Sequence, residues 1–109
     1  MSESQREGSH LQPMGGGRFA IHGDLTFESA TSVLEQSRTL FAENESILVD
    51  MTGVEDADSA GLALLIEWLS WASKAAREIT YENVPEEITA IAEISEVSNL
   101  INASSSARA

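Results

Sequence analysis

A chain of 109 residues, 42% of them hydrophobic and 22% charged, is long enough for one domain with a buried core and too short for two. Eighteen acidic residues against six basic ones give a formal net charge of −12, which disfavours nucleic acids and anionic membrane surfaces as ligands and favours a protein partner with a basic face. The absence of cysteine excludes disulfides, and the polar start and short apolar runs predict a soluble cytoplasmic protein with no secretory signal and no membrane insertion.

The N-terminal part of the chain predicts a tip, a hairpin and a helix. Residues 1–9 are polar and lack a pattern, so they are expected to form a disordered tip. Two short strands are expected at 10–14 and 18–22, joined by a glycine triplet. From Phe27 onwards apolar residues recur at helical spacing, and Thr26 is positioned to cap that helix.

The rest of the chain alternates strands with helices. Residues 46–50 are a short apolar run, typical of a strand buried on both faces, and an acidic connection is expected at 51–58. The strongest helical pattern covers Ser59 to about Ala76. A strand follows at 78–82, and Pro85 opens a further helix.

The predicted order of elements is β-β-α-β-α-β-α. This order favours a single α/β domain at residues 10–102, in which helices pack against a mixed β-sheet. A last short turn is expected at 97–101, and residues 103–109 are expected to be a flexible tail.

The long helix that starts at Ser59 carries two apolar stripes. The stripe expected to face the core comprises Leu62, Leu65, Ile66, Leu69, Ala72 and Ala76. The second stripe comprises Leu64, Trp68, Trp71 and Ala75, which widens the apolar sector to roughly 220°. Either neighbouring helices of the domain cover the second stripe, or Trp68 and Trp71 are partly exposed and contact a partner. The second interpretation is favoured, since tryptophan is enriched at interface hot spots and a small domain has few helices for covering.

The segment just before this helix also carries candidate site residues. Asp58 or Ser59 can cap the first turn, and Gly61 permits close approach of another chain. Ser59 stands at a positive helix end, which favours a phosphate or a polar partner. Taken alone, these residues indicate a helix cap.

The order of these motifs resembles the STAS domain of anti-sigma-factor antagonists. A buried strand, Ile47-Leu-Val-Asp50, is followed by Met51-Thr-Gly-Val54 and by Asp58-Ser-Ala-Gly-Leu62 before a long apolar helix. Gly23-Asp-Leu25 is similar to the Gly-Glu-Leu of that family. The resemblance covers residues 18–101 approximately and implies a STAS-like fold without enzymatic activity. The chain departs from the family pattern at Ala75-Ala-Arg77-Glu78, where the family has a glycine.

Two branches of the family imply two functions. Gly61-Leu-Ala-Leu-Leu-Ile-Glu-Trp68 and Tyr81-Glu-Asn-Val-Pro85 look more like the MlaB-type branch. Members of that branch are cytoplasmic accessory subunits bound to the ATPase of a phospholipid-transporting ABC complex that maintains outer-membrane lipid asymmetry. The alternative is an anti-sigma-factor antagonist that a kinase phosphorylates at Ser59.

The resemblance also implies which residues contact the partner. Ser59 is expected to make the close polar contact, and Asp56 and Asp58 are expected to pair with basic residues of the ATPase. The full set of expected contact residues is Asp56, Asp58, Ser59, Ala60, Gly61, Leu62, Trp68 and Trp71.

Other chemistries find little support in the sequence. The acidic segment before the long helix matches part of a calcium loop, but Ala60 stands where an oxygen ligand is required. Asp50 resembles a response-regulator phosphoacceptor, without the acidic pair that would hold magnesium. His10 and His22 have no further ligands nearby. No catalytic residue, metal, cofactor or small-molecule substrate is therefore expected, and ATP and lipid would belong to partner subunits.

Overall fold

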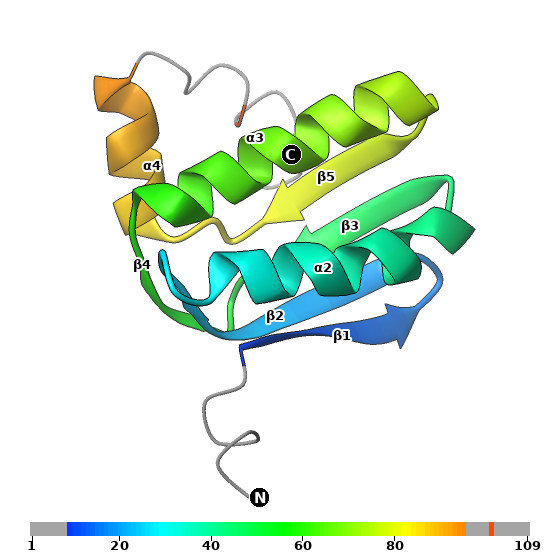
Figure 1. The fold of residues 1–109 in the computed structure, drawn as a ribbon, viewed down its shortest axis with the longest axis horizontal. Coiled ribbons are helices and arrows are strands. Elements are labelled where there is room, and N and C mark those ends of the chain that lie inside the picture. Colours follow the sequence, from blue (N-terminus) through cyan, green and yellow to red (C-terminus); the bar gives the residue numbers. More distant parts are fainter. Residues whose placement is uncertain (1–8, 96–100, 102–109) are drawn as a thin grey trace, which may run out of the picture.

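The computed structural model describes residues 9–95 and 101 (Figure 1). The tip at 1–8, the tail at 103–109 and most of the expected turn at 97–101 lie outside these residues. Ser9, expected in the disordered tip, is instead buried, and its hydroxyl accepts a hydrogen bond from Asp24 N at 3.0 Å. Ser9 therefore packs with the domain, and the expectations for residues 1–8 stay predictions.

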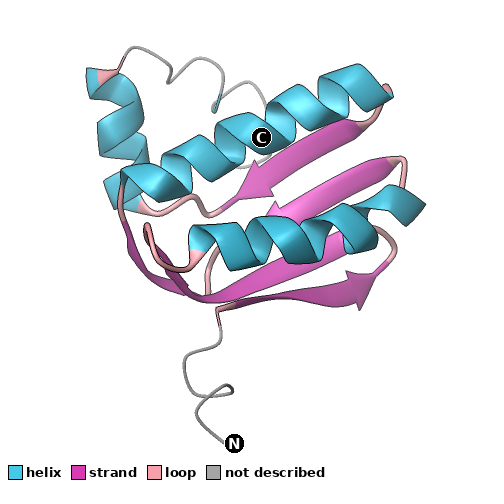
Figure 2. Cartoon of the chain, viewed as in Figure 1, coloured by secondary structure: helices cyan, strands magenta, loops and turns pink. Residues whose placement is uncertain are grey.

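Five strands form one mixed sheet (Figure 2). They are β1 (His10–Gly15), β2 (Arg18–Leu25), β3 (Ser46–Asp50), β4 (Val54–Ala57) and β5 (Glu78–Glu82). The sheet runs β1-β2-β3-β5, with β1 antiparallel to β2 and the other pairs parallel. The predicted mixed α/β architecture is confirmed.

Strand β4 is an element that the sequence did not predict. It pairs in parallel with the second half of β2, where Gly23 faces Val54 and Leu25 faces Ala57. Its sequence, Val-Glu-Asp-Ala, is short and acidic, and only Ala57 in it is buried. Pairing with a strand that continues beyond the end of β3 therefore stabilises a segment whose own pattern is that of a loop, and the order becomes β-β-α-β-β-α-β-α.

Three α-helices complete the described domain. Helices α2 (Ala30–Leu40) and α3 (Ser59–Ala75) lie side by side on the same face of the sheet, while α4 (Glu86–Ile94) lies beside the start of α3 (Figure 1). A 3-10 turn, η1 (Phe41–Glu43), extends α2. The core between the sheet and these helices contains Phe19, Ile21, Leu25, Val33, Phe41, Ile47, Val49, Leu65, Trp68, Tyr81, Ile88 and Ile101.

The first helix begins later than its apolar periodicity predicts. The Ser29 hydroxyl accepts a hydrogen bond from Thr26 N at 2.9 Å and donates one to Asp24 O at 2.7 Å. These bonds hold residues 26–29 as a turn, so the helix starts at Ala30 and Thr26 gives it no side-chain cap. Phe27, expected on the buried side of the helix, lies in that turn and is 82% exposed.

Helix α3 ends on a residue in the left-handed conformation. Ala76 has φ 59° and ψ 44°, and its N–H donates to Ala72 O and Ser73 O. A left-handed conformation brings the Cβ atom close to the following carbonyl and costs roughly 1–2 kcal/mol in a non-glycine residue. An alanine thus makes a turn that glycine would make without this penalty, at a cost in stability.

Replacing Ala76 with glycine should therefore raise the free energy of unfolding by up to about 1 kcal/mol, since glycine has no Cβ penalty there. Equilibrium urea denaturation measures the change as a higher midpoint. Ala75→Gly, one residue earlier and inside the helix, is the matched control and should lower stability by a similar amount. A loss of stability in both variants would show that the left-handed turn carries no relievable strain.

Candidate functional site

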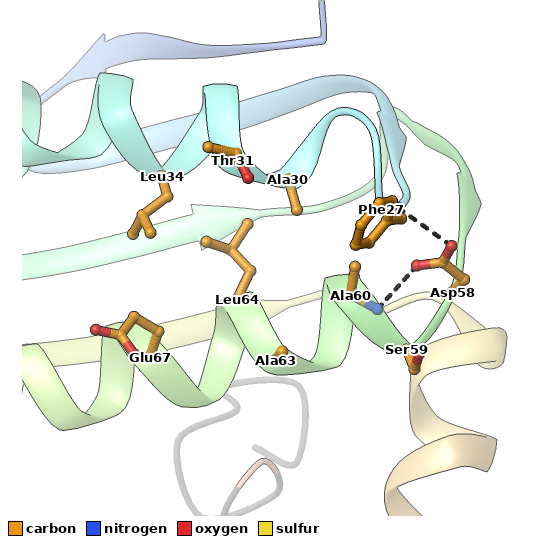
Figure 3. A pocket seen from close by; sticks show the side chains of 10 residues that line it. All are labelled: Phe27, Ala30, Thr31, Leu34, Asp58, Ser59, Ala60, Ala63, Leu64 and Glu67. Carbon is orange, nitrogen blue, oxygen red and sulfur yellow. Dashed lines mark hydrogen bonds between the residues drawn. The ribbon is translucent and has the colours of Figure 1, made fainter.

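An open groove of about 630 Å³ lies between α2 and α3. In Figure 3, Leu34 from α2 and Leu64 from α3 point toward one another across it, and Phe27 stands at one end beside Ala60. The lining comprises Phe27, Ala30, Thr31 and Leu34 on the α2 side and Asp58, Ser59, Ala60, Ala63, Leu64 and Glu67 on the α3 side. Most of this surface is apolar, so the groove suits a protein partner better than a polar metabolite.

Asp58 forms hydrogen bonds to both sides of the groove at the end where Phe27 lies. One carboxylate oxygen, Oδ1, accepts a hydrogen bond from Ala60 N at 2.8 Å and so caps α3. The other, Oδ2, accepts one from Phe27 N at 3.2 Å, which ties the turn before α2 to the start of α3. The capping function anticipated for this segment is therefore carried out by Asp58. Because both of its oxygens already accept bonds from this chain, any pairing with a basic partner residue would be additional.

Ser59 and Phe27 are the exposed residues at this end of the groove. Ser59 is the first residue of α3, and its side chain is open to solvent (Figure 3). Phe27 is 82% exposed, although burying a phenylalanine side chain is worth about 1.5–3 kcal/mol. Phe27 was not among the predicted contact residues, because the helical spacing placed it on a buried face.

Gly61 and Leu62, two expected contact residues, belong to the core. Leu62 is 6% exposed. A Cβ on Gly61 would lie 3.0 Å from Leu25 O and 3.0 Å from Ile88 Cδ1. The close approach that Gly61 permits is thus made by β2 and α4 of the same chain, and the contact of Gly61 and Leu62 with a partner stays a prediction.

The two tryptophans differ in their surroundings. Trp68 is 1% exposed, its Nε1 donates to Ser37 Oγ at 2.9 Å, and its ring centroid lies 5.0 Å from that of Phe41. The expectation that Trp68 is partly exposed is therefore wrong, because α2 covers this part of the second stripe. Trp71 is half-buried, with the Arg77 guanidinium 5.7 Å from its ring centroid.

Trp71 lines a second hollow of about 260 Å³ that adjoins the groove. The second hollow is lined by Leu34, Ser37, Arg38, Phe41, Glu67, Trp68 and Trp71. Leu34 and Glu67 line both spaces, so the two hollows are neighbours along α2 and α3, and together they are called the α2–α3 groove. Five of the expected contact residues line this groove, namely Asp58, Ser59, Ala60, Trp68 and Trp71. Asp56 is exposed on β4 and does not line it.

Two ionisable groups with shifted pKa values lie outside the groove. Hydrogen bonds from the Thr52 side chain, from Asn83 and from Thr52 N to Asp50 lower the pKa of that carboxyl. Asp50 thereby fixes the turn after β3 through one carboxylate oxygen, Oδ1, which accepts all three bonds. Burial raises the pKa of Tyr81, whose hydroxyl donates to Leu65 O at 2.7 Å. Both groups serve the fold.

Residues 9–95 and 101 contain no group of three or more His, Asp or Glu side chains arranged to hold a metal ion. No helix in that part of the chain is long and apolar enough to cross a membrane.

Comparison with known proteins identifies the class and then the family. The chain is similar to the solved structure of the anti-sigma factor antagonist SpoIIAA in its unphosphorylated form, with a TM-score of 0.59, 15% sequence identity, and coverage of 77% of this chain and 80% of that one. At this identity the likeness establishes the fold. A family model described as "Mlab, STAS domain" matches residues 14–102. The chain belongs to this MlaB-type STAS family, which confirms the resemblance drawn from its motifs. A comparison with curated protein sequences gives no significant match.

Proposed function

We propose that this chain is a non-catalytic accessory subunit that docks on the ATPase of a phospholipid-transporting ABC complex at the cytoplasmic face of the inner membrane. Membership of the MlaB-type STAS family supports this assignment. The role in outer-membrane lipid asymmetry, like the identity of the ATPase, is part of the proposal. ATP, magnesium and lipid are handled by the partner subunits.

The exposure of Phe27, which lines the same hollow as Ser59, is the observation that carries the proposal. A large aromatic side chain that is 82% exposed at the mouth of an apolar groove is costly unless a partner covers it. Ser59 adds a hydroxyl at the same end, where a helix N-terminus favours polar contact. Such a site suits a lasting protein complex, because the apolar surface then spends little time in water.

The test is affinity purification of the tagged chain from detergent-solubilised membranes of its native host, followed by mass spectrometry. We expect an ABC ATPase and its permease with the wild-type chain. Phe27→Ala should lower the affinity for the ATPase at least about tenfold, since it removes most of the burial of one aromatic side chain. Ser59→Arg should abolish recovery by placing a long charged side chain at the contact.

Ile94→Ala is the matched control, because Ile94 is also 82% exposed but lies at the end of α4, outside the groove. Its recovery of the ATPase should equal that of the wild-type chain. If Phe27→Ala and Ile94→Ala lowered recovery of the ATPase equally, the groove would not be the docking surface. Recovery of a soluble kinase-like anti-sigma factor in place of the ATPase would contradict the transporter assignment.

The exposed Ser59 also favours a second candidate function, an anti-sigma-factor antagonist controlled by phosphorylation of that hydroxyl. Ser59 is accessible to a kinase in this structure. Asp58 beside it would repel a phosphate, and the positive end of α3 would offset part of that repulsion. Phosphate-affinity electrophoresis of protein from its native host distinguishes the two functions, since a single unmodified band under all growth conditions counts against the switch.

A further inference from the structure

Glu67 is an isolated carboxylate in the middle of the apolar groove. It lies on α3 (Figure 3), it lines both hollows, and it is exposed. Within the described part of the chain, its carboxylate forms no hydrogen bond and no ion pair. Asp58, the other acidic residue of the lining, already accepts two backbone N–H groups. Glu67 is therefore the carboxylate of the groove with full capacity to bind an incoming cation.

The negative charge around the groove favours a partner segment that carries a positive charge. The lining of the larger hollow contains Asp58 and Glu67 and no basic residue, and the whole chain carries a formal charge of −12. Arg38 enters the lining only in the smaller hollow and forms no ion pair with Glu67. An occupant with a Lys or Arg opposite Glu67 would gain a charge-assisted hydrogen bond in a partly desolvated place.

The shape of the groove selects a helix as the occupant. The α3 wall includes Ala60, Ala63, Glu67 and Trp71, which follow one another at spacings of three, four and four residues, with Leu64 next to Ala63. These residues span about 16 Å, or three helical turns. A third helix laid between α2 and α3 packs its own ridge of side chains into such a row, as amphipathic helices do in hydrophobic grooves.

We propose that the α2–α3 groove binds an amphipathic helix of the partner, which places a Lys or Arg against Glu67 between two apolar anchors. One anchor lies on Leu34 and Leu64 and is covered by Phe27, and the other enters the hollow beside Trp71. This inference rests on the proposed function only in taking the groove as the docking surface. Glu67 then determines which partner helix is accepted.

The first test compares Glu67 variants in the purified complex with the ATPase. Glu67→Gln should weaken binding about tenfold and Glu67→Lys about a hundredfold, near the lower end of the cost of losing a charge pair at an interface, because Glu67 is exposed in the free chain. Glu35→Lys is the matched control, because Glu35 is exposed on α2 outside both hollows and its replacement changes the net charge equally. Its effect should stay below about threefold, as expected of a charge that only steers the encounter. Equal effects at Glu67 and Glu35 would overturn the inference while leaving the proposed function intact.

The second test identifies the residue opposite Glu67. The chain has no cysteine, so Glu67→Cys offers one site for a thiol-specific photo-crosslinker. The crosslinked partner segment should be a helix with a Lys or Arg between apolar residues, and changing that residue to Glu should restore binding to Glu67→Lys. Crosslinks to a non-helical segment, or to a segment without a basic residue, would refute the inference.

A third test is independent of the ATPase. Two synthetic amphipathic helical peptides of about 14 residues, about 20 Å long, would share a leucine face and carry either Lys or Glu at the central position. The emission of Trp71, one of two tryptophans in the chain, reports occupancy of the groove. The wild-type chain should bind the Lys peptide at least about tenfold more tightly, and Glu67→Lys should reverse the preference. An unchanged preference in Glu67→Lys would overturn the inference even if no ATPase were ever recovered.

Discussion

Trp68→Ala is expected to lower the free energy of unfolding by about 3–5 kcal/mol, the range found when a large buried aromatic residue is truncated. Trp68 is 1% exposed and packs against the rings of Phe41 and Tyr81. The change leaves a cavity between α2, α3 and the sheet and removes the hydrogen bond to Ser37. Equilibrium urea denaturation, followed by far-UV circular dichroism, measures the loss as a lower midpoint.

Trp71→Ala is the matched comparison, on the same helix one turn further on. Trp71 is half-buried, so its truncation should lower the free energy of unfolding by only about 1–2 kcal/mol. Its exposed part should contact the partner, so the variant should also bind the partner more weakly per folded molecule. If Trp68→Ala kept wild-type stability and lost the partner, Trp68 would be an interface residue after all. The same outcome would contradict the packing of α2 over α3.

The helical wheel of α3 predicted two apolar stripes but not what covers the second one. Amphipathic periodicity records which residues share a face, whereas the covering element is set by tertiary packing. Helix α2 lies over Leu64 and Trp68 and leaves Trp71 half-buried, so the stripe is covered along part of its length. The first interpretation therefore holds for the turn at Trp68, whereas Trp71 is partly exposed and its contact with a partner stays a prediction.

The strands and helices with strong periodicity were predictable, and the exceptions have local causes. Strand β4 depends on pairing with the second half of β2, which no pattern in its four residues reveals. Phe27 continues the apolar spacing of α2 towards the N-terminus. The hydrogen bonds of Ser29 nevertheless hold residues 26–29 as a turn, so the helix starts only after Phe27, at Ala30. The Thr26 to Ser29 spacing was a signal of a turn at this point, and recognising it would have indicated an exposed aromatic residue beside the candidate site.

Gly61→Val should lower the free energy of unfolding by about 3 kcal/mol, at the upper end of the usual cost of overpacking. A Cβ at this position would lie 3.0 Å from Leu25 O, a backbone atom that cannot move without disturbing β2. It would also lie 3.0 Å from Ile88 Cδ1 on α4, and the two methyl groups of valine add to this crowding. Alanine is a weaker test, because its better helix propensity, worth about 1 kcal/mol over glycine, opposes the steric cost. Urea denaturation midpoints of the two variants measure the effect.

Ala63→Val is the control for the lower helix propensity of a β-branched residue. Ala63 is exposed on the same helix, so valine there lowers the helix propensity without crowding a neighbouring element. It should cost less than about 1 kcal/mol. Since Gly61 is packed against β2 and α4, the fraction of Gly61→Val that remains folded should bind the partner within about twofold of the wild-type chain. A Gly61→Val chain with wild-type stability and no partner binding would mean instead that a second chain approaches Gly61, and the docking surface would then extend beyond the groove towards α4.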